Sequence, residues 1–539
     1  MSTIKEKART FDVVFDTLLR HPYIVIALLC ALLLPFGFAQ ASQIAEGHIA
    51  FEELLWLFGM VALTLFGKPS KSFKINLYLL LSSAVMILLF SLMVSENPQH
   101  AQMMFIPVGV GIFQLGAVMY AEKSLKTDRL ILLMMVLGVV VRYCYVLRYD
   151  HTQLQHDVGS FEGTHGHASY IMYWYENGLK LPDFDVSTRW QFYHPPLHHL
   201  LMALLIRIFT FFGMELGQAQ QAIQILPMLY SSLCMVVCWR IFKLIHLDGA
   251  GLAVACAVVC FHPTFIIWSG AYNNDMLATL LMLLGVLWTL KWAKKPDLMH
   301  ILPIAVCIGF GMMSKLSAWM VAPAVALVFL VVFIRNIKKP LPFIGQFAAF
   351  GVICVPAALW WQVRNLMQFG LPLTYVPDTN SAAMSVKDVP VMKRLFDFSM
   401  SQFSFPFEGF TMYGSPYNEY NPLIGLLKTS VFDEDRKAWF INELPSAIIL
   451  AFGLLAIVGF VFLMIWLFKK NTATDFVTKA FFVIIFFTIL ISYYIFCFQF
   501  PYVCTENIRY CIPVIPILGI GLGYGVNCIG KTLRQHKAE

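Results

Sequence analysis

Long apolar segments recur along this sequence and constrain its fold more than any other feature. About 14 of them approach the ~20 residues that an α-helix needs to cross the hydrocarbon core of a bilayer. Charged residues make up 13% of the chain and hydrophobic residues 59%, whereas soluble domains carry about 25% charged residues. We therefore predict an all-α polytopic membrane protein. The expected spans lie at residues 22–40, 51–67, 73–93, 103–121, 128–147, 222–241, 249–268, 276–293, 301–313, 317–334, 342–363, 444–468, 475–498 and 510–530.

Lysine and arginine alternate regularly between the connections that join these spans. Basic residues precede the first span and recur in the later alternate turns, while the turns at 41–50 and 94–102 contain none. Because basic residues collect in cytoplasmic connections, we predict that both termini are cytoplasmic and that residues 149–221 are extracytoplasmic. The net charge of +7 is then a consequence of membrane topology and does not indicate a nucleic-acid partner.

The apolar run at 194–213 breaks this alternation. If it crossed the membrane, later basic residues such as Lys294 and Lys469 would fall on the extracytoplasmic side. We therefore expect a juxtamembrane helix at the outer surface. Trp190 and Tyr193 would anchor it, because aromatic side chains prefer the membrane interface.

The expected topology divides the chain into five parts. The first is an amphipathic helix on the cytoplasmic surface, the second a four-helix N-terminal extension, and the third a core that contains the catalytic outer loop 149–221. An outer loop or cap with short helices and a C-terminal group of spans with a short cytoplasmic tail complete the chain. The five parts are residues 1–21, 22–127, 128–363, 364–443 and 444–539.

The segment from Tyr149 to His199 is the first long polar interruption and the first place to expect a site. It holds seven of the 14 histidines of the chain. Within it, Asp157 is the candidate catalytic residue, since a carboxylate there could accept a proton from an acceptor hydroxyl. The alternative is an exposed loop aspartate or a helix N-cap.

A second acidic turn, with Asn274 and Asp275, directly precedes the span at 276–293. Asp275 could orient a substrate or hold a divalent cation through carboxylate oxygens. The alternative is that Asn274 or Asp275 simply caps the helix that follows.

Three basic residues stand at helix ends on the predicted outer face, against the usual distribution of positive charge. They are Arg509, Lys315 and Arg364. A lipid phosphate lies at that depth, and arginine grips phosphate through paired hydrogen bonds. The alternative is that these side chains extend from helix ends into the polar interface.

Histidines of the outer loop are possible metal ligands, although their spacing is not diagnostic. His165 with His167, and His194 with its neighbours, are plausible zinc ligands, while a wet interfacial loop also tolerates histidine. No cofactor is certain. A divalent metal remains possible, with Asp157, Asp275 and His194 as its possible ligands.

Four short motifs occur in a fixed order along the chain. They are His156-Asp157, FYHPPLHH at 192–199, GMMSKLSA at 311–318 and NIRYCIP at 507–513. With these motifs the sequence resembles the GT-C superfamily of integral-membrane glycosyltransferases, and within it the bacterial group related to protein O-mannosyltransferases and to the aminoarabinose transferase that modifies lipid A. The sequence departs from the commonest pattern at Val158, where the family often has the second residue of an Asp-Glu pair.

The resemblance implies a GT-C-like bundle with outer juxtamembrane helices and a large outer loop. It implies a polyprenyl-phosphate or dolichyl-phosphate sugar as donor, an envelope glycan, lipid or protein as acceptor, and inversion at the anomeric carbon. Asp157 is then the expected base, and Arg509, Lys315 and Arg364 the expected phosphate ligands. The expected substrate loop comprises His156, Glu162, His167, Tyr193, His194 and His198.

Two other functions remain open on the sequence. A lipid or small-molecule transporter would carry ionisable groups or broken helices at mid-membrane, and few occur in the apolar runs. A polymerase or ligase of lipid-linked glycans would share the outer site and the basic residues. We favour a glycosyltransferase of the inner (plasma) membrane whose active site faces the extracytoplasmic side.

Overall fold

The computed structural model describes residues 10–31, 59–96, 105–149, 155–379, 382–399, 403, 419–433 and 444–536. These residues are mainly helical, and they include one isolated β-bridge, between Ser385 and Tyr502. The α-helices are α1 (Thr10–Arg20), α4 (Phe73–Glu96), α5 (Phe105–Ala121), α6 (Thr127–Arg148), α7 (His167–Asn177), α8 (Leu197–Phe211), α9 (Leu216–Ala222), α10 (Ile225–Leu244), α11 (Gly249–Phe261), α12 (Pro263–Ile267), α13 (Asp275–Lys294), α14 (Leu298–Ser314), α15 (Ala322–Arg335), α16 (Leu341–Phe369), α17 (Val391–Phe396), α19 (Pro422–Phe432), α20 (Leu444–Phe468), α21 (Phe476–Gln499) and α22 (Val514–His536).

Short helical turns join several of these helices. They are the π-helical turn η2 (Leu63–Gly67) and the 3-10 turns η4 (Val186–Thr188), η5 (Trp268–Gly270), η6 (Leu316–Val321), η7 (Ala382–Met384), η9 (Val503–Thr505) and η10 (Ile508–Tyr510). Several parts of the expected elements lie outside the described residues: residues 1–9 of the amphipathic helix, 32–40 of the span at 22–40, 51–58 of the span at 51–67, and 380–381, 400–402, 404–418 and 434–443 of the outer segment. The described part of that segment holds short helices, as expected.

Eight helices among the described residues are long and apolar enough to cross a membrane, and two bent pairs raise the number to ten. Each of the eight coincides with an expected span, which confirms a polytopic all-α membrane protein. The expected number of about 14 is larger. The expected spans at 22–40 and 51–67 lie partly outside the described residues, and the apolar stretches Phe73–Leu89 of α4, Pro107–Ala121 of α5 and Leu298–Ser314, which is α14, are shorter than 18 residues. The bent pairs are Asp12–Arg20 with Pro22–Ala31, and Gly249–Phe261 with Pro263–Gly270.

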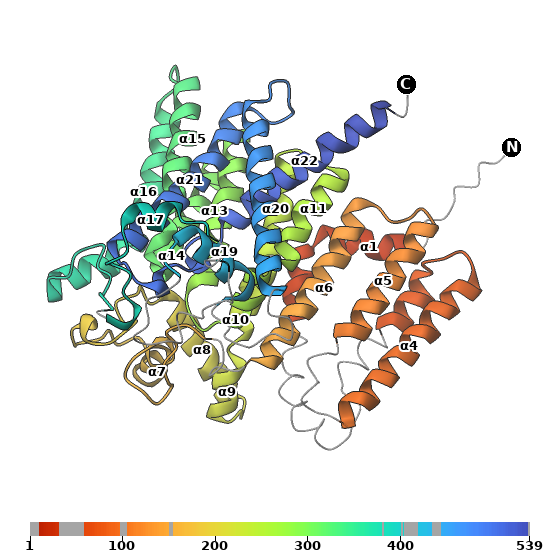
Figure 1. Ribbon diagram of the computed structural model, residues 1–539, viewed down its shortest axis with the longest axis horizontal. Helices are drawn as coiled ribbons and strands as arrows, with labels where there is room; N and C mark the ends of the chain where they lie inside the picture. The colour runs from red at the N-terminus through yellow and green to blue at the C-terminus, as the bar shows by residue number, and fades with distance from the viewer. Residues whose placement is uncertain are drawn as a thin grey trace.

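The two ends of the helical bundle differ in what they carry. Helices α7, α8 and α9 lie at the bottom of Figure 1, whereas the α15–α16 turn, the α20–α21 turn and the end of α22 lie at the top. The expected outer loop and the expected cytoplasmic basic turns are therefore at opposite ends. Helix α8 has 15 residues, fewer than a crossing needs; its place at the outer membrane surface stays a prediction.

Glycines allow α22 to approach two neighbouring helices at backbone distance. A Cβ atom on Gly521 would lie 1.8 Å from the carbonyl oxygen of Gly459 in α20, and one on Gly251 of α11 would lie 2.3 Å from the carbonyl oxygen of Gly523. Small residues permit such close crossings between membrane helices. The position of α22 is therefore fixed by backbone contacts on two sides.

A buried arginine stabilises the break between α11 and α12. Arg142 of α6 is 0% exposed, and it donates to the carbonyl oxygens of Cys260 and Val259 at 2.8 and 3.0 Å and to Ser231 Oγ at 2.8 Å. The helix breaks here because Pro263 has no N–H to continue it. Arg142 supplies donors to carbonyls near that break, so we interpret this intramembrane charge as structural.

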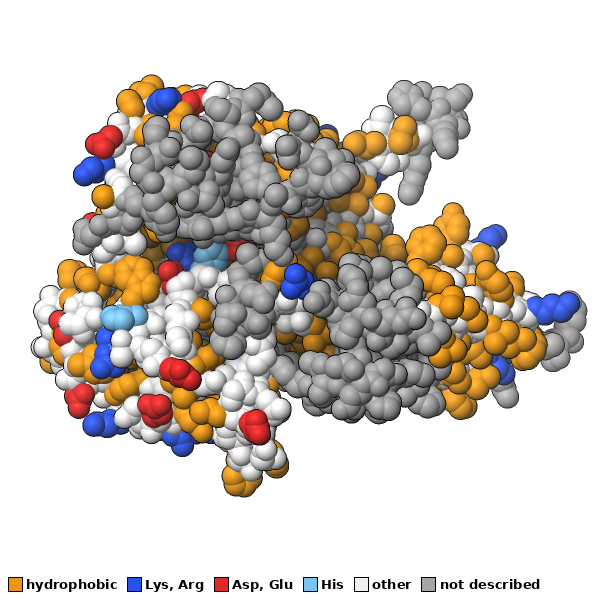
Figure 2. Space-filling model, turned by 60° about the horizontal axis from the view of Figure 1, so that its bottom comes forward, with side chains coloured by type: hydrophobic (Ala, Val, Ile, Leu, Met, Phe, Trp, Pro, Cys, Tyr) orange, Lys and Arg blue, Asp and Glu red, His pale blue; other side chains and the backbone are white. Residues whose placement is uncertain are grey.

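Helix α1 is attached to α6 through a second buried arginine. Arg129 Nη1 lies 2.5 Å from Asp12 and Nη2 lies 3.3 Å from Asp16, both on α1. Apolar side chains such as Phe15 and Leu132 pack beside this contact. The N-terminal helices form the largely hydrophobic surface at the right of Figure 2, as expected of helices that face lipid.

A network of buried charges holds the outer segment against the connection between α21 and α22. Arg394 of α17 donates to Glu506 at 3.2 Å, and Lys428 of α19 donates to Glu419 at 2.6 Å. Burial raises the pKa of Glu506 to about 7, although Arg394 acts in the opposite direction. Glu506 is therefore a group whose protonation is coupled to folding.

We predict that Gly521→Ala lowers the melting temperature of the detergent-purified protein, because the added Cβ must push α22 away from α20. Gly351→Ala in α16 is the matched control, since a Cβ there meets nothing within 4 Å. Alanine by itself favours a helix by about 1 kcal/mol over glycine, so the control should melt at the same temperature or higher. Equal melting temperatures for both variants would contradict the close crossing.

We predict that Glu506→Gln flattens the pH dependence of unfolding. Between about pH 4.5 and pH 7, the unfolded chain releases this proton while the folded protein keeps it, so the free energy of unfolding falls as pH rises. The variant should lose this slope and melt higher than the wild type at pH 8. Thermal unfolding from pH 5 to pH 8 measures the effect, with the exposed Glu162→Gln as control; an unchanged slope would contradict it.

Candidate active site

A cavity of about 440 Å³ opens at the end of the bundle that carries the outer loop. Its walls come from the outer loop, the start of α13, the residues that follow α14, the end of α16 with the chain after it, and the segment from α21 to η10. Figure 2 turns this end toward the reader and shows acidic, basic and histidine side chains over its lower-left part. The expected site residues that line the cavity are Asp157, His167, Tyr193, His194, Asn274, Asp275, Lys315 and Arg509.

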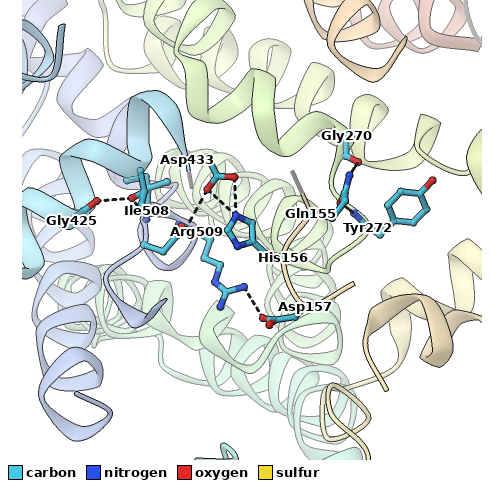
Figure 3. Close-up of polar contacts among 11 residues, drawn as sticks. Gln155, His156, Asp157, Gly270, Tyr272, Gly425, Asp433, Ile508 and Arg509 are labelled. Atoms are coloured by element: carbon cyan, nitrogen blue, oxygen red, sulfur yellow. Dashed lines mark hydrogen bonds and ion pairs between the residues drawn. The ribbon is translucent and has the colours of Figure 1, made fainter. Parts of the chain in front are cut away.

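Asp157 and Arg509 meet at the wall of this cavity. Arg509 Nη1 donates to Asp157 Oδ2 at 3.0 Å, across 352 positions of sequence. The side chain of Arg509 is 13% exposed and that of Asp157 is 30% exposed. Figure 3 shows the guanidinium and the carboxylate directed toward each other. The structure therefore brings together the expected base and the expected phosphate ligand.

A tight loop presents Asp157 to the cavity. Its backbone is left-handed, with φ of 54°, and its carbonyl oxygen accepts the N–H of His167 at 3.0 Å. A Cβ on Gly159 would lie 2.1 Å from the carbonyl oxygen of His165, so the loop closes only with glycine at that position. The start of α7 thus holds the carboxylate in place.

Charge around Asp157 keeps it ionised. Burial opposes ionisation, but the Arg509 guanidinium, His156 and hydrogen bonds from Arg509 and Trp190 outweigh it and lower the pKa of Asp157 below its usual value. A carboxylate that is ionised at neutral pH can accept a proton from a bound hydroxyl group.

The second acidic turn lies on the same cavity and holds a second cation. Lys315 Nζ, at the end of α14, donates to Asp275 Oδ1. Asn274 donates to the carbonyl oxygen of Ser314 at 2.6 Å, which fixes the start of α13 against the end of α14. Burial and the nearby Arg509 lower the pKa of Lys315, while Asp275 acts in the opposite direction.

The outer-loop histidines form a buried stack at the cavity. The His167 ring lies 5.7 Å from that of His194, and its Nδ1 lies 2.8 Å from His199 Nε2. Burial lowers the pKa of His167 and of His194 well below 6.5, and the positive Lys315 adds to the effect. Both imidazoles are therefore neutral at physiological pH and can donate and accept hydrogen bonds.

Several expected site residues lie behind the cavity or away from it. His198 is fully buried and its Nε2 contacts the carbonyl oxygen of Tyr272 at 2.9 Å; burial lowers its pKa to about 4. Glu162 lies in an exposed turn. Arg364 bonds Asn365 at 2.8 Å and the carbonyl oxygen of Pro182. These three side chains are absent from the cavity lining formed by the described residues.

The possible metal ligands are engaged in other contacts. Among the described residues, no group of three or more His, Cys, Asp and Glu side chains is placed to hold a metal ion. Asp157 and Asp275 are instead each paired with a cation, Arg509 and Lys315 respectively. The donor set here thus does not fit a metal centre, and we derive no step through one.

The structure adds three residues that sequence reasoning missed. Tyr510 lines the cavity and accepts a hydrogen bond from Arg509 Nη2 at 2.8 Å, and Trp190 lines it beside Asp157. Asp433 lies behind the cavity, where its carboxylate meets His156 Nε2 at 2.7 Å. Tyr510 could have been found from its place in the NIRYCIP motif, whereas no pattern distinguishes Asp433 from the other acids around it.

A comparison with known families supports the expected resemblance. Residues 193–361 match the family model described as dolichyl-phosphate-mannose-protein mannosyltransferase. The matched region runs from the cavity residue Tyr193 to Trp361 of α16 and includes Asp275 and Lys315, but neither Asp157 nor Arg509. No curated protein matches the chain. This match covers 169 of the 539 residues. Together with the spanning helices, it supports a resemblance to multi-pass membrane glycosyltransferases of the GT-C type.

Proposed function

We propose that the protein transfers a sugar from a polyprenyl-phosphate donor to an acceptor hydroxyl, with inversion, at the extracytoplasmic face of the inner membrane. The acceptor is an envelope glycan, a lipid or a protein. The observation that carries the proposal is the meeting of Asp157 and Arg509 at 3.0 Å on one cavity wall. Asp157 supplies a base and Arg509 supplies a ligand for a phosphate. A transfer of this kind needs both groups.

The proposed reaction assigns a role to each charge. Asp157 accepts the proton of the acceptor hydroxyl as its oxygen attacks the anomeric carbon. The bond between that carbon and the phosphate oxygen breaks, and polyprenyl phosphate leaves. Arg509 and Lys315 stabilise the negative charge that grows on the leaving phosphate. The neutral side chains of His167 and His194 are placed to bind sugar hydroxyls.

The rest of the cavity wall suits a lipid-linked donor. Beyond the charged residues, it is lined by apolar side chains that include Trp319, Met320, Ile495, Phe496 and Phe500. Trp319 and Met320 come from η6, and Ile495 and Phe496 come from α21; both η6 and α21 belong to spanning helices. Phe500 directly follows α21. A prenyl chain could lie there while its phosphate reaches Arg509.

The proposed orientation follows from the distribution of charge. The turns at the end opposite the cavity include exposed basic residues such as Lys338, Lys339 and Lys469. Basic turns face the cytoplasm, so we assign both termini to that side and the cavity to the other.

We predict that Asp157→Asn lowers the rate of sugar transfer by about 10²-fold or more, because general-base catalysis contributes at least this factor. The measurement uses membrane vesicles, a panel of labelled polyprenyl-phosphate sugars and the release of polyprenyl phosphate. Asp183→Asn is the matched control, since this aspartate is 76% exposed beside Lys180. Wild-type rates in Asp157→Asn would remove the proposed base.

We predict that Arg509→Gln weakens the binding of polyprenyl phosphate on the order of tenfold, as expected for a lost hydrogen bond between charged groups. Lys315→Gln should weaken it as well. Binding of labelled polyprenyl phosphate to the protein in nanodiscs measures the effect, and Lys180→Gln, a change at an exposed lysine, should bind as the wild type does. If Arg509→Gln binds as tightly as the control, the guanidinium is not a phosphate ligand.

A further inference from the structure

Asp433 is a buried carboxylate that contacts the segment carrying Asp157. It directly follows α19, has φ of 53° and a side chain that is 2% exposed. His156 Nε2 lies 2.9 and 2.7 Å from its two carboxylate oxygens. The His156 ring is stacked 5.0 Å from that of Trp268. His156 is thus fixed on one side by a carboxylate and on another by an indole.

The same end of α19 contacts the segment that carries Arg509. Asn507 Nδ2 donates to Asp433 Oδ1 at 3.4 Å, and Asn507 Oδ1 accepts the backbone N–H of Arg509 at 2.9 Å. One turn earlier in α19, Thr429 Oγ1 accepts the N–H of Ile508 at 2.8 Å. Figure 3 shows Asp433 between His156 and the chain that leads to Arg509.

We propose that Asp433 is a positioning residue for sugar transfer, which ties the segment of Asp157 to the segment of Arg509 through His156 and Asn507. This inference rests on the proposed function of Asp157 and Arg509. Asp433 does not line the cavity formed by the described residues, so it acts through its neighbours and not on the substrate.

The contact between Asp433 and His156 also has an electrostatic effect on Asp157. A buried carboxylate at hydrogen-bond distance favours the positively charged form of an imidazole, and a charged His156 stands next in sequence to Asp157. His156 is one of the groups that lower the pKa of Asp157. Asp433 therefore helps to keep the proposed base ionised while it also fixes its position.

Other ionisable groups act on Asp157 and are unchanged by a substitution at Asp433. Arg509 and Lys315 favour its ionised form, and the phenols of Tyr193 and Tyr510 are close enough to interact with its charge. Asp433 and Asp157 both interact with His156. Removing the charge of Asp433 should thus change the titration of Asp157 through His156.

The first test measures the pH at which Asp157 ionises and does not require the protein to be catalytically active. A water-soluble carbodiimide modifies protonated carboxyl groups, and mass spectrometry of the Asp157 peptide across a pH series gives its labelling midpoint. The variants are Asp433→Asn, His156→Gln and their combination in the full-length protein in nanodiscs. Asp397→Asn is the matched control, because this aspartate lies in the same outer segment and accepts a hydrogen bond there, from the hydroxyl group of Tyr420.

The expected result is a labelling midpoint for Asp157 that rises by on the order of one pH unit in Asp433→Asn, by a similar amount in His156→Gln, and no further in the combination. The control should keep the wild-type midpoint. A wild-type midpoint in His156→Gln, which is the variant less exposed to folding defects, would overturn the inference. Additive shifts in the combination would also overturn it.

The second test measures transfer by the same variants. Asp433→Asn should lower kcat by about tenfold while KM for the donor changes less than threefold, and the acidic limb of the pH–rate profile should move to higher pH, as the labelling midpoint does. If the wild type transfers no sugar from any donor, the proposed function fails, and the labelling still decides the coupling. If the wild type transfers sugar but both pH midpoints are unchanged in Asp433→Asn, the positioning role alone is overturned.

Discussion

The ion pair between Asp157 and Arg509 is the interaction on which the site depends. Its two members come from parts of the chain 352 positions apart, and they meet only because α22 begins beside the outer loop. Isolated charges are costly at the edge of a membrane, so each cation at the cavity is balanced by an acid, Arg509 by Asp157 and Lys315 by Asp275. A phosphate that entered the cavity would find both cations already in place and partly desolvated.

Charges elsewhere in the described residues are balanced by different means. Arg142 is satisfied by backbone carbonyls and a serine inside the bundle, and Arg129 by two aspartates of α1. Neither side chain lines the cavity. Arg142 and Arg129 thus stabilise helix packing, whereas Arg509 faces a cavity large enough for a substrate. This distribution of charge favours an enzyme over a transporter, which would carry charges along an intramembrane path.

Sequence reasoning predicted the helical class and the placement of several cavity residues. Apolar length and the alternation of basic turns are local signals, so eight expected spans and the short helix at 197–211 could be placed from them. Asp157 was predicted because it lies in the first long polar interruption of the apolar chain, and Lys315 and Arg509 because basic residues are uncommon on the expected outer face. Arg364 and His198 were expected at the site on the same ground, but tertiary packing turns them toward Pro182 and Tyr272. Asp433 could not be foreseen, since its burial depends on how α19 packs.

The glycine contacts of α22 have a consequence for how a substrate can be admitted. This helix follows closely after Arg509 and touches α11 and α20 backbone to backbone through Gly251, Gly523, Gly459 and Gly521. Such contacts leave α22 little room to slide along its neighbours, so the position of the Arg509 guanidinium is nearly fixed. A substrate that enters the cavity therefore meets an Arg509 that adjusts little, next to the loop that bears Asp157, which itself turns tightly at Gly159 and Gly166.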